Sequence, residues 1–248
     1  MEIIVEKIVA IHQPNFLPWL GFFDKWRRAD YFVWLDEVQL VRRTYLSRAS
    51  FLEREKAGTI SVPVVHTGSQ ETLICEAQID TSQWQPDKVI KRLRFAYGKL
   101  PHWENLERSL ADIITRTVHS SLLDLNVALL FWIGEEILQL DRSKIIFQSS
   151  LATKDAKSAL MAEITALVGG TVYLSGGKAP SEEETNGVGA AAYNNPDDFE
   201  KRDVRLEYQN FAPVAYPQGR HPFVKGLSAL DAIAHLGPKG AREHLCHY

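Results

Sequence analysis

Near the N-terminus of the chain, short apolar runs alternate with a stretch in which apolar residues recur at helical spacing. Residues 7–11 form an apolar run that ends at His12, and residues 31–35 form another that is rich in aromatic and β-branched side chains. The spacing of apolar residues between these two runs predicts a helix over residues 19–28. This order predicts a strand–helix–strand unit with parallel strands and a right-handed crossover.

The same alternation returns in the C-terminal half of the chain. It predicts strands at residues 144–147, 171–174 and 204–208, and helices at residues 155–168 and 227–236. Gly237 and Pro238 end the last of these helices. Residues 178–195 are rich in Gly, Ala, Asn and acidic residues, and we expect a loop or lid there.

The middle of the chain is helical, at about residues 85–140. Apolar residues recur at helical spacing in three stretches, which predict helices at residues 85–97, 103–117 and 121–140. Ser121 and Asp124 resemble a capping box at the start of the third helix. Before this region we expect strands at residues 59–65 and 72–79, joined as a hairpin by a turn at 67–69.

These elements predict an α/β fold. We expect a mainly parallel sheet built from βαβ units, with a helical layer or insertion in the middle of the chain. A chain of 248 residues suits one large domain or two small ones, and we expect a single domain over residues 1–248. In such sheets ligands bind outside the carboxyl ends of the strands, so polar residues at those ends are the candidates for a site.

Composition and charge exclude several classes of protein. A net charge of -3 gives no overall attraction to nucleic acid or to an anionic membrane, and we expect a small-molecule substrate instead. Cys75 and Cys246 are too few for a disulfide framework, and neither belongs to a CxxC pair of a zinc site. No motif identifies a cofactor, and His235, His244 and His247 lack the spacing and support of metal ligands.

No membrane or export signal is expected. The N-terminus has no basic region before an apolar core, so it does not predict a signal peptide. The most apolar stretch, residues 122–140, contains Asp124, Asn126, Glu135 and Glu136 and therefore predicts a buried helix of a soluble protein. We expect a cytoplasmic protein without a membrane span. Its oligomeric state is left open by the sequence.

His12 and Asp36 are the candidate catalytic residues. His12 leaves a buried strand and enters a turn held by Pro14 and Pro18, which suits a general base. If the first two strands are neighbours, Asp36 can orient the His12 imidazole and raise its basicity. Two plainer alternatives remain. In the first, His12 and Asn15 only satisfy backbone groups of the turn, and in the second Asp36 begins a solvated turn.

Other polar and aromatic residues near the strand ends are candidate binding residues. They are Gln13, Asn15, Trp19, Gln39, Tyr45, Arg48, Ser149, Ser175 and Gly176. Among them, an Arg fork suits phosphate or carboxylate, and Trp19 or Tyr45 could stack on a sugar ring or base. Ordinary helix capping is the alternative role of Ser149, and Gly176 permits close approach of a ligand to the backbone beside Ser175.

The run from His12 to Lys25, His-Gln-Pro-Asn-Phe-Leu-Pro-Trp-Leu-Gly-Phe-Phe-Asp-Lys, resembles the characteristic motif of the WbqC-like protein family. The resemblance covers nearly the whole chain. It continues at residues 29–30, 35–39, 61–64, 173–176, 216–218, 223 and 227–231.

The resemblance implies a bacterial protein of O-antigen or other surface-polysaccharide biosynthesis that transfers glycine or a similar acyl group to a sugar or nucleotide sugar. His12 would then be the base, and Asn15 or Gln39 would donate to the oxyanion. Arg48 would hold a nucleotide-sugar phosphate and Ser175 a hydroxyl or phosphate. Two departures from the family pattern bear on the substrate. Only Arg48 carries over from an Asn-Arg-Asn-like run, and the segment after Gly176 is longer and more acidic.

Two other functions stay open. A strand, a turn with His and Pro, and a helix are also typical of nucleotidyltransferases, although their paired-His motif is missing because only His12 lies in the turn. A non-catalytic accessory protein that binds sugar nucleotides is the second alternative, since no complete catalytic triad or metal site is visible.

Overall fold

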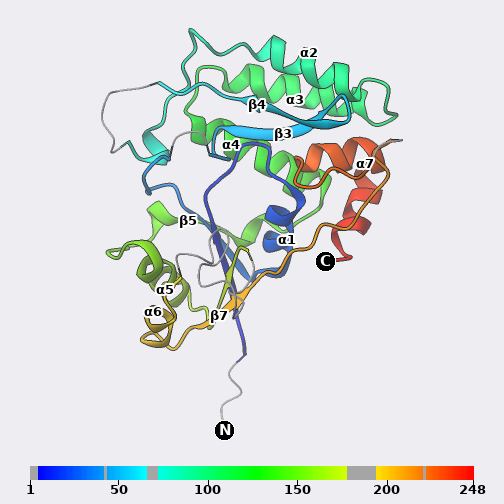
Figure 1. Cartoon of the computed structure of the whole chain (residues 1–248). Coiled ribbons are helices and arrows are strands. Elements are labelled where there is room, and N and C mark those ends of the chain that lie inside the picture. The colour runs from blue at the N-terminus through cyan, green and yellow to red at the C-terminus, as the bar shows by residue number, and fades with distance from the viewer. Residues whose placement is uncertain (1–4, 42–43, 66–71, 178–193, 220–221) are drawn as a thin grey trace. The chain divides into compact units, whose positions relative to one another are not determined.

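The computed structural model describes residues 5–41, 44–65, 72–177, 194–219 and 222–248 (Figure 1). The chain divides into two compact units. Unit 1 comprises residues 1–13, 23–35 and 141–212, and unit 2 comprises residues 14–22, 36–140 and 213–248. Each unit is therefore assembled from separate stretches of the chain, and the single-domain organisation stays a prediction.

Unit 1 is built on a five-stranded parallel sheet. Its strand order is β5-β2-β1-β6-β7, and all four pairs of neighbouring strands are parallel. The strands are β1 (Ile8–His12), β2 (Tyr31–Trp34), β5 (Ile145–Phe147), β6 (Val172–Ser175) and β7 (Arg205–Tyr208). All five predicted strands of this sheet are confirmed, and so is the α/β class with a mainly parallel sheet.

Three helices accompany these strands. Helix α1 (Leu20–Arg28) connects β1 to β2 and belongs to unit 1 from Phe23 onward. Helix α5 (Lys157–Leu167) lies between β5 and β6 in the chain, as predicted, and packs against β6. The sequence did not predict the short helix α6 (Pro196–Glu200), which is capped by the Asn195 side chain and packs against α5 and β7. The predicted loop at 178–195 falls almost wholly outside the described residues.

The core of unit 1 is rich in aromatic rings. The Trp26 ring of α1 lies 5.7 Å from that of Trp34, edge to face, and Trp34 in turn lies 5.6 Å from Phe147. Such edge-to-face pairs add about 0.5–1.5 kcal/mol each beyond the burial of their area. Strand β1 lies at the centre of the sheet, where Val9 and Ala10 are fully buried, and this explains its unbroken apolar sequence.

Unit 2 contains the helical middle of the chain, as predicted. Its long helices are α2 (Pro86–Tyr97), α3 (Trp103–Thr117), α4 (Leu122–Phe131) and α7 (Ala229–Leu245). The Ser121 hydroxyl accepts from the Asp124 N–H at 3.0 Å, and Asp124 accepts from the Ser121 N–H, so the capping box is confirmed. The predicted helix at 121–140 changes to a π-helix over Trp132–Ile137. In α7, Gly237 has φ 73° and kinks the helix where Gly237 and Pro238 were predicted to end it.

The predicted hairpin of residues 59–65 and 72–79 is present only in part. Val64 forms an antiparallel bridge with Ile79, and the Val65 N–H donates to the Gln78 carbonyl at 2.9 Å. Strand β4 (Lys56–Ser61) pairs antiparallel with β3 (Arg48–Glu53), which the sequence did not predict. Arg54 and Glu55 form the turn with φ 49° and 67°, values that Asn and Gly adopt more readily, so the usual hairpin signal is missing. Residues 74–76 form a 3-10 turn, and the predicted turn at 67–69 lies outside the described residues.

Within the described ranges, the search for membrane spans found no helix with the length and apolar character to cross a bilayer.

Candidate functional site

A pocket of about 360 Å³ lies in unit 1, at the carboxyl ends of β1 and β6. We call it the β1–β6 pocket. It is lined by Ile11, His12, Gln13, Lys25, Leu35, Lys157, Ser158, Met161, Tyr173 and Asn194. The chain runs from β1 outward through β2 to β5 and then returns to the other side of β1 with β6 and β7. The strand order therefore reverses between β1 and β6, which is where open parallel sheets bind their ligands.

His12 is the last residue of β1 and is half-buried in this pocket. Its Nδ1 lies 2.9 Å from the Gln13 carbonyl oxygen. A carbonyl can only accept, so the contact favours the tautomer with the proton on Nδ1. Burial, helped by the positive charge of Lys25, lowers the pKa of His12 to about 3. The imidazole is therefore neutral at pH 7, with the lone pair on Nε2.

Lys25 is one of the site residues that the sequence analysis missed, together with Lys157, Ser158 and Asn194. It lies on α1, is 2% exposed, and its Nζ donates to the Ile11 carbonyl at 3.0 Å. Burial lowers the pKa of Lys25 to about 7. Among the described residues no carboxylate forms an ion pair with it. A sequence signal did exist, because Lys25 lies three residues after Phe22 and four before Ala29, on the apolar face of the helix.

Ser175 and Ser158 form hydrogen bonds with residues 194 and 195 beside the pocket. Ser175 ends β6 fully buried, and its Oγ accepts from Asn194 Nδ2 at 2.8 Å, so Ser175 acts on the pocket through Asn194. The Ser158 Oγ accepts from the Asn195 N–H at 2.9 Å. Tyr173 stacks on Phe199 with centroids 5.2 Å apart, and burial raises the pKa of Tyr173 to about 12. This tyrosine therefore stays protonated at neutral pH.

Helix α5 begins at the pocket with an uncapped first turn. Its N-cap residue, Ala156, has no capping side chain, and the first turn contains no acidic residue. Lys157, the first residue of the helix, is exposed, lines the pocket and has φ 55°. Left-handed backbone costs a non-glycine residue about 1–2 kcal/mol, and such residues cluster at functional sites. The N–H groups of this first turn and the positive end of the helix favour an anion here.

Six of the predicted site residues belong to unit 2. They are Asn15, Trp19, Asp36, Gln39, Tyr45 and Arg48. Asp36 is 3% exposed, and its carbonyl accepts from the Cys75 N–H at 2.8 Å. Tyr45 is 69% exposed, which suits a stacking platform. The pairing of Asp36 with His12, which lies in unit 1, stays a prediction.

The remaining predicted residues lie at strand ends of unit 1. Gln13 lines the pocket, and Gly176 follows β6 directly. Ser149 lies in the turn after the outer strand β5, is exposed, and is not among the residues that line the pocket. Its neighbour Ser150 donates to the Phe147 carbonyl at 2.7 Å, which is the ordinary role of a serine in a turn.

The turn that follows His12 is held by a buried amide of unit 2. Asn126 on α4 is fully buried, and its Nδ2 donates at 2.8 Å to the carbonyls of both Pro14 and Leu46. Also in this unit, the Phe16 N–H donates to the Tyr45 carbonyl at 2.9 Å. Residues 14–16 are thus tied to residues 45–46 by one direct hydrogen bond and by the Asn126 amide, which bridges the carbonyls of Pro14 and Leu46. Sequence reasoning had read Asn126 only as a polar residue that argues against a membrane helix.

Metal ligation finds no support in the part of the chain that the structure describes. No group of three or more His, Cys, Asp or Glu residues there could hold a metal ion. The β1–β6 pocket itself offers the His12 imidazole, the Lys25 and Lys157 amines, and the backbone N–H groups of the first turn of α5.

Comparisons with known proteins agree with the motif in residues 12–25. A family model described as "WbqC-like protein family" matches residues 13–243. A protein of Mycobacterium tuberculosis named "Uncharacterized protein Rv1507c" is 28% identical over 232 residues, which cover 93% of this chain and 94% of that protein. No solved structure matches.

Proposed function

The chain belongs to the WbqC-like protein family, and we propose on this premise that it is a transferase that moves glycine or a similar acyl group onto a sugar or nucleotide sugar. The reaction takes place in the β1–β6 pocket. The observation that carries the proposal is Lys25, a buried amine whose pKa of about 7 suits proton transfer at neutral pH.

Lys25 is the general base of this proposal. Because burial lowers the pKa of Lys25 from 10.5 to about 7, the neutral amine is accessible near neutral pH, unlike that of an ordinary lysine. The amine or hydroxyl of the acceptor sugar attacks the acyl carbonyl carbon, and a C–N or C–O bond forms. The neutral Lys25 amine takes the proton of the attacking group. The bond between the acyl carbon and the donor's leaving group then breaks, and Lys25 returns the proton to that leaving group.

His12 is a positioning group in the same step. With a pKa of about 3 it is a weak base at pH 7, so Lys25 is better matched to proton transfer than His12 is. As a neutral imidazole in the lining of the pocket, His12 can align the nucleophilic atom of the acceptor. This changes the role that we expected for His12, but it keeps the residue in the site.

Lys157 and the first turn of α5 support a phosphate-bearing substrate. The positive charge of Lys157 and the N–H groups of the first turn, which has no capping side chain and no acidic residue, suit the diphosphate of a nucleotide sugar. A nucleotide sugar is therefore the preferred acceptor.

The test combines ligand binding with product detection. Wild type, His12→Ala and Lys25→Met are screened by thermal shift against nucleotide sugars and acyl donors, and hits are incubated together and analysed by mass spectrometry. A ligand at 100 times its dissociation constant stabilises by about 2.7 kcal/mol, which is easily measured. Lys201→Met, an exposed lysine of unit 1 outside the pocket, is the matched control.

We expect an acylated nucleotide sugar with wild type and with Lys201→Met. Lys25→Met should slow its formation by about 10²-fold or more, because general bases contribute about 10²–10⁴-fold. A Lys25→Met protein that forms product at the wild-type rate refutes the role of Lys25. Binding of a sugar nucleotide without any turnover by wild type would favour the accessory role instead.

The strand order supports nucleotidyl transfer as a second candidate. Numbered by their order in the chain, the five strands are arranged 3-2-1-4-5, which matches the doubly wound order 3-2-1-4-5-6 of nucleotide-binding sheets without its last strand. In that reaction an oxygen of the acceptor attacks the α-phosphorus of a nucleoside triphosphate and pyrophosphate leaves. Release of pyrophosphate from ATP or CTP, measured with a coupled assay, distinguishes this candidate from acyl transfer.

A further inference from the structure

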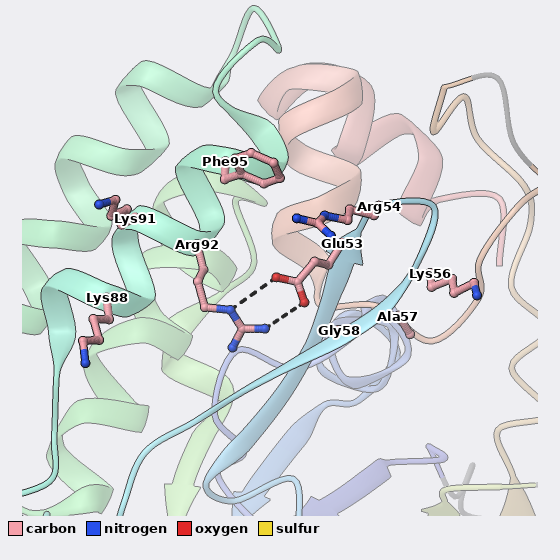
Figure 2. A pocket seen from close by; sticks show the side chains of 9 residues that line it. All are labelled: Glu53, Arg54, Lys56, Ala57, Gly58, Lys88, Lys91, Arg92 and Phe95. Atoms are coloured by element: carbon pink, nitrogen blue, oxygen red, sulfur yellow. Dashed lines mark hydrogen bonds and ion pairs between the residues drawn. The ribbon is translucent and has the colours of Figure 1, made fainter.

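Unit 2 has a second hollow, formed by the β3–β4 hairpin and helix α2 (Figure 2). We call it the cationic hollow. Its volume is about 880 Å³, within the range of small-molecule sites. It is lined by Glu53, Arg54, Lys56, Ala57, Gly58, Lys88, Lys91, Arg92 and Phe95.

Positive charge dominates this lining. Arg92 is neutralised by Glu53, the acidic residue of the lining, through Nε–Oε1 and Nη2–Oε2 contacts of 3.3 and 2.8 Å. Its Nη1 also donates to the Thr59 carbonyl at 2.9 Å, so Arg92 joins α2 to the hairpin. The other four cations are Arg54, Lys56, Lys88 and Lys91. Within the described ranges none of these four forms an ion pair, although the whole chain has a net charge of -3.

An exposed aromatic ring lies at one end of the hollow. Phe95 is 71% exposed, and the Arg54 guanidinium lies 5.9 Å from the centre of its ring. Figure 2 shows Phe95 and Arg54 near each other at this end, while Lys88 and Lys91 extend from the length of α2. Arg54 reaches Phe95 from a hairpin turn whose two residues both have left-handed φ, a conformation that is unfavourable for Arg and Glu.

We propose that the cationic hollow binds a nucleotide, a ligand with one aromatic ring and two or more phosphate groups. The ring of the base stacks on Phe95 or on the Arg54 guanidinium plane, as bases do on aromatic and arginine side chains. The phosphates lie against the lysines, which suit phosphate as point charges. The four cations that form no ion pair among the described residues match the three to four negative charges of a nucleoside di- or triphosphate.

A long nucleic acid fits the molecule less well. Proteins that follow a nucleic acid backbone have basic domains, whereas this chain has a net charge of -3 and a sequence pI of about 6.3. The rest of the surface would repel a long polyanion, so a ligand that ends within the hollow is favoured. This site does not depend on the function proposed for the β1–β6 pocket.

The test is isothermal titration calorimetry of the full chain with ATP, ADP and inorganic tripolyphosphate. Two variants probe the hollow: Lys88→Gln/Lys91→Gln removes two of its charges, and Phe95→Ala removes the ring. Arg108→Gln/Arg116→Gln, two exposed arginines of α3, is the matched charge control. His12→Ala/Lys157→Gln removes binding at the β1–β6 pocket, so that a loss at either site is distinguished from a loss at the other.

We expect nucleotide binding that survives in His12→Ala/Lys157→Gln and in the control. Lys88→Gln/Lys91→Gln should weaken it by about tenfold, as loss of charge-assisted hydrogen bonds predicts. Phe95→Ala should weaken ATP binding by about fivefold or more and leave tripolyphosphate binding unchanged. Three results would overturn the proposal: no binding of ATP or ADP in the millimolar range, binding that is lost only in His12→Ala/Lys157→Gln, or equal losses in the control.

Discussion

Replacement of Lys25 by methionine measures the free energy that the buried amine costs the fold. Lys25 is 2% exposed, and its pKa falls from the ordinary 10.5 to about 7. At about 1.4 kcal/mol for each pH unit, this fall corresponds to about 5 kcal/mol. Methionine keeps a chain of similar length and needs no hydrogen bond, so Lys25→Met removes the cost of the charge with little change in volume.

The sign of the pH dependence follows from proton binding. Between pH 7 and 10.5 the unfolded chain keeps the lysine proton, whereas the folded protein has released it. The unfolded state therefore binds more protons, and the stability of wild type rises with pH across this window. Below pH 7 both states are protonated, and the full cost is present. Above pH 10.5 both are neutral, and the cost disappears.

The assay is urea unfolding of wild type and Lys25→Met at several pH values between 7 and 9.5. We expect the stability advantage of Lys25→Met to shrink by about 1.4 kcal/mol for each pH unit. Groups that both proteins share cancel in this difference. Lys201→Met, which removes an exposed lysine, should show no such trend. A difference that stays constant with pH would mean that Lys25 keeps an ordinary pKa in the folded protein, and the argument for a neutral base would fail.

Three further predictions concern the site and its supports. If Lys25 is the base, kcat/KM of the transfer should rise as pH increases through about 7 and then level off, and a profile that is flat between pH 6 and 8.5 would exclude this group. Asn126→Ala removes two hydrogen bonds to buried carbonyls and should lower the free energy of unfolding by about 2–3 kcal/mol, measured in urea, whereas an unchanged midpoint would contradict this role. Gly170→Ala places a Cβ 2.2 Å from the Val9 side chain in the central strand and should cost about 1–3 kcal/mol. Gly169→Ala, with φ 73° and open space around it, should cost about 1 kcal/mol in thermal unfolding, and equal losses at the two glycines would refute the packing argument.

The strands of the parallel sheet could be predicted because the sequence pattern that marks each strand lies within the strand itself. Strands such as β1 and β6 are short apolar runs bounded by polar residues, and helix α3 begins and ends where its apolar period does. The β3–β4 hairpin could not be predicted in the same way. Its turn at Arg54 and Glu55 has a left-handed backbone but contains neither Gly nor Asn, so the residue types did not predict a turn there. Pairing with a neighbouring strand and packing against α2 hold this turn, and both are properties of the folded chain.

The candidate site, too, could be predicted from the sequence only in part. The positions of His12 and Ser175 follow from the sequence, because each comes at the end of an apolar strand and parallel strands bring such ends to one edge of the sheet. Their actual roles depended on the fold. Ser175 reaches the pocket only through Asn194, nineteen residues away in the chain, and Lys25 reaches it from the apolar face of helix α1.

The pattern of residues thus decided which segments become strands and helices and which polar groups stand at strand ends. The order β5-β2-β1-β6-β7 and the lowered pKa of Lys25 were decided only in three dimensions. The physical reason lies in the range of the forces. Backbone preference and periodicity act within a few residues, whereas the pKa of an amine depends on the loss of water around it. That loss is produced by side chains from distant parts of the chain, so the property that makes Lys25 a candidate base exists only after folding.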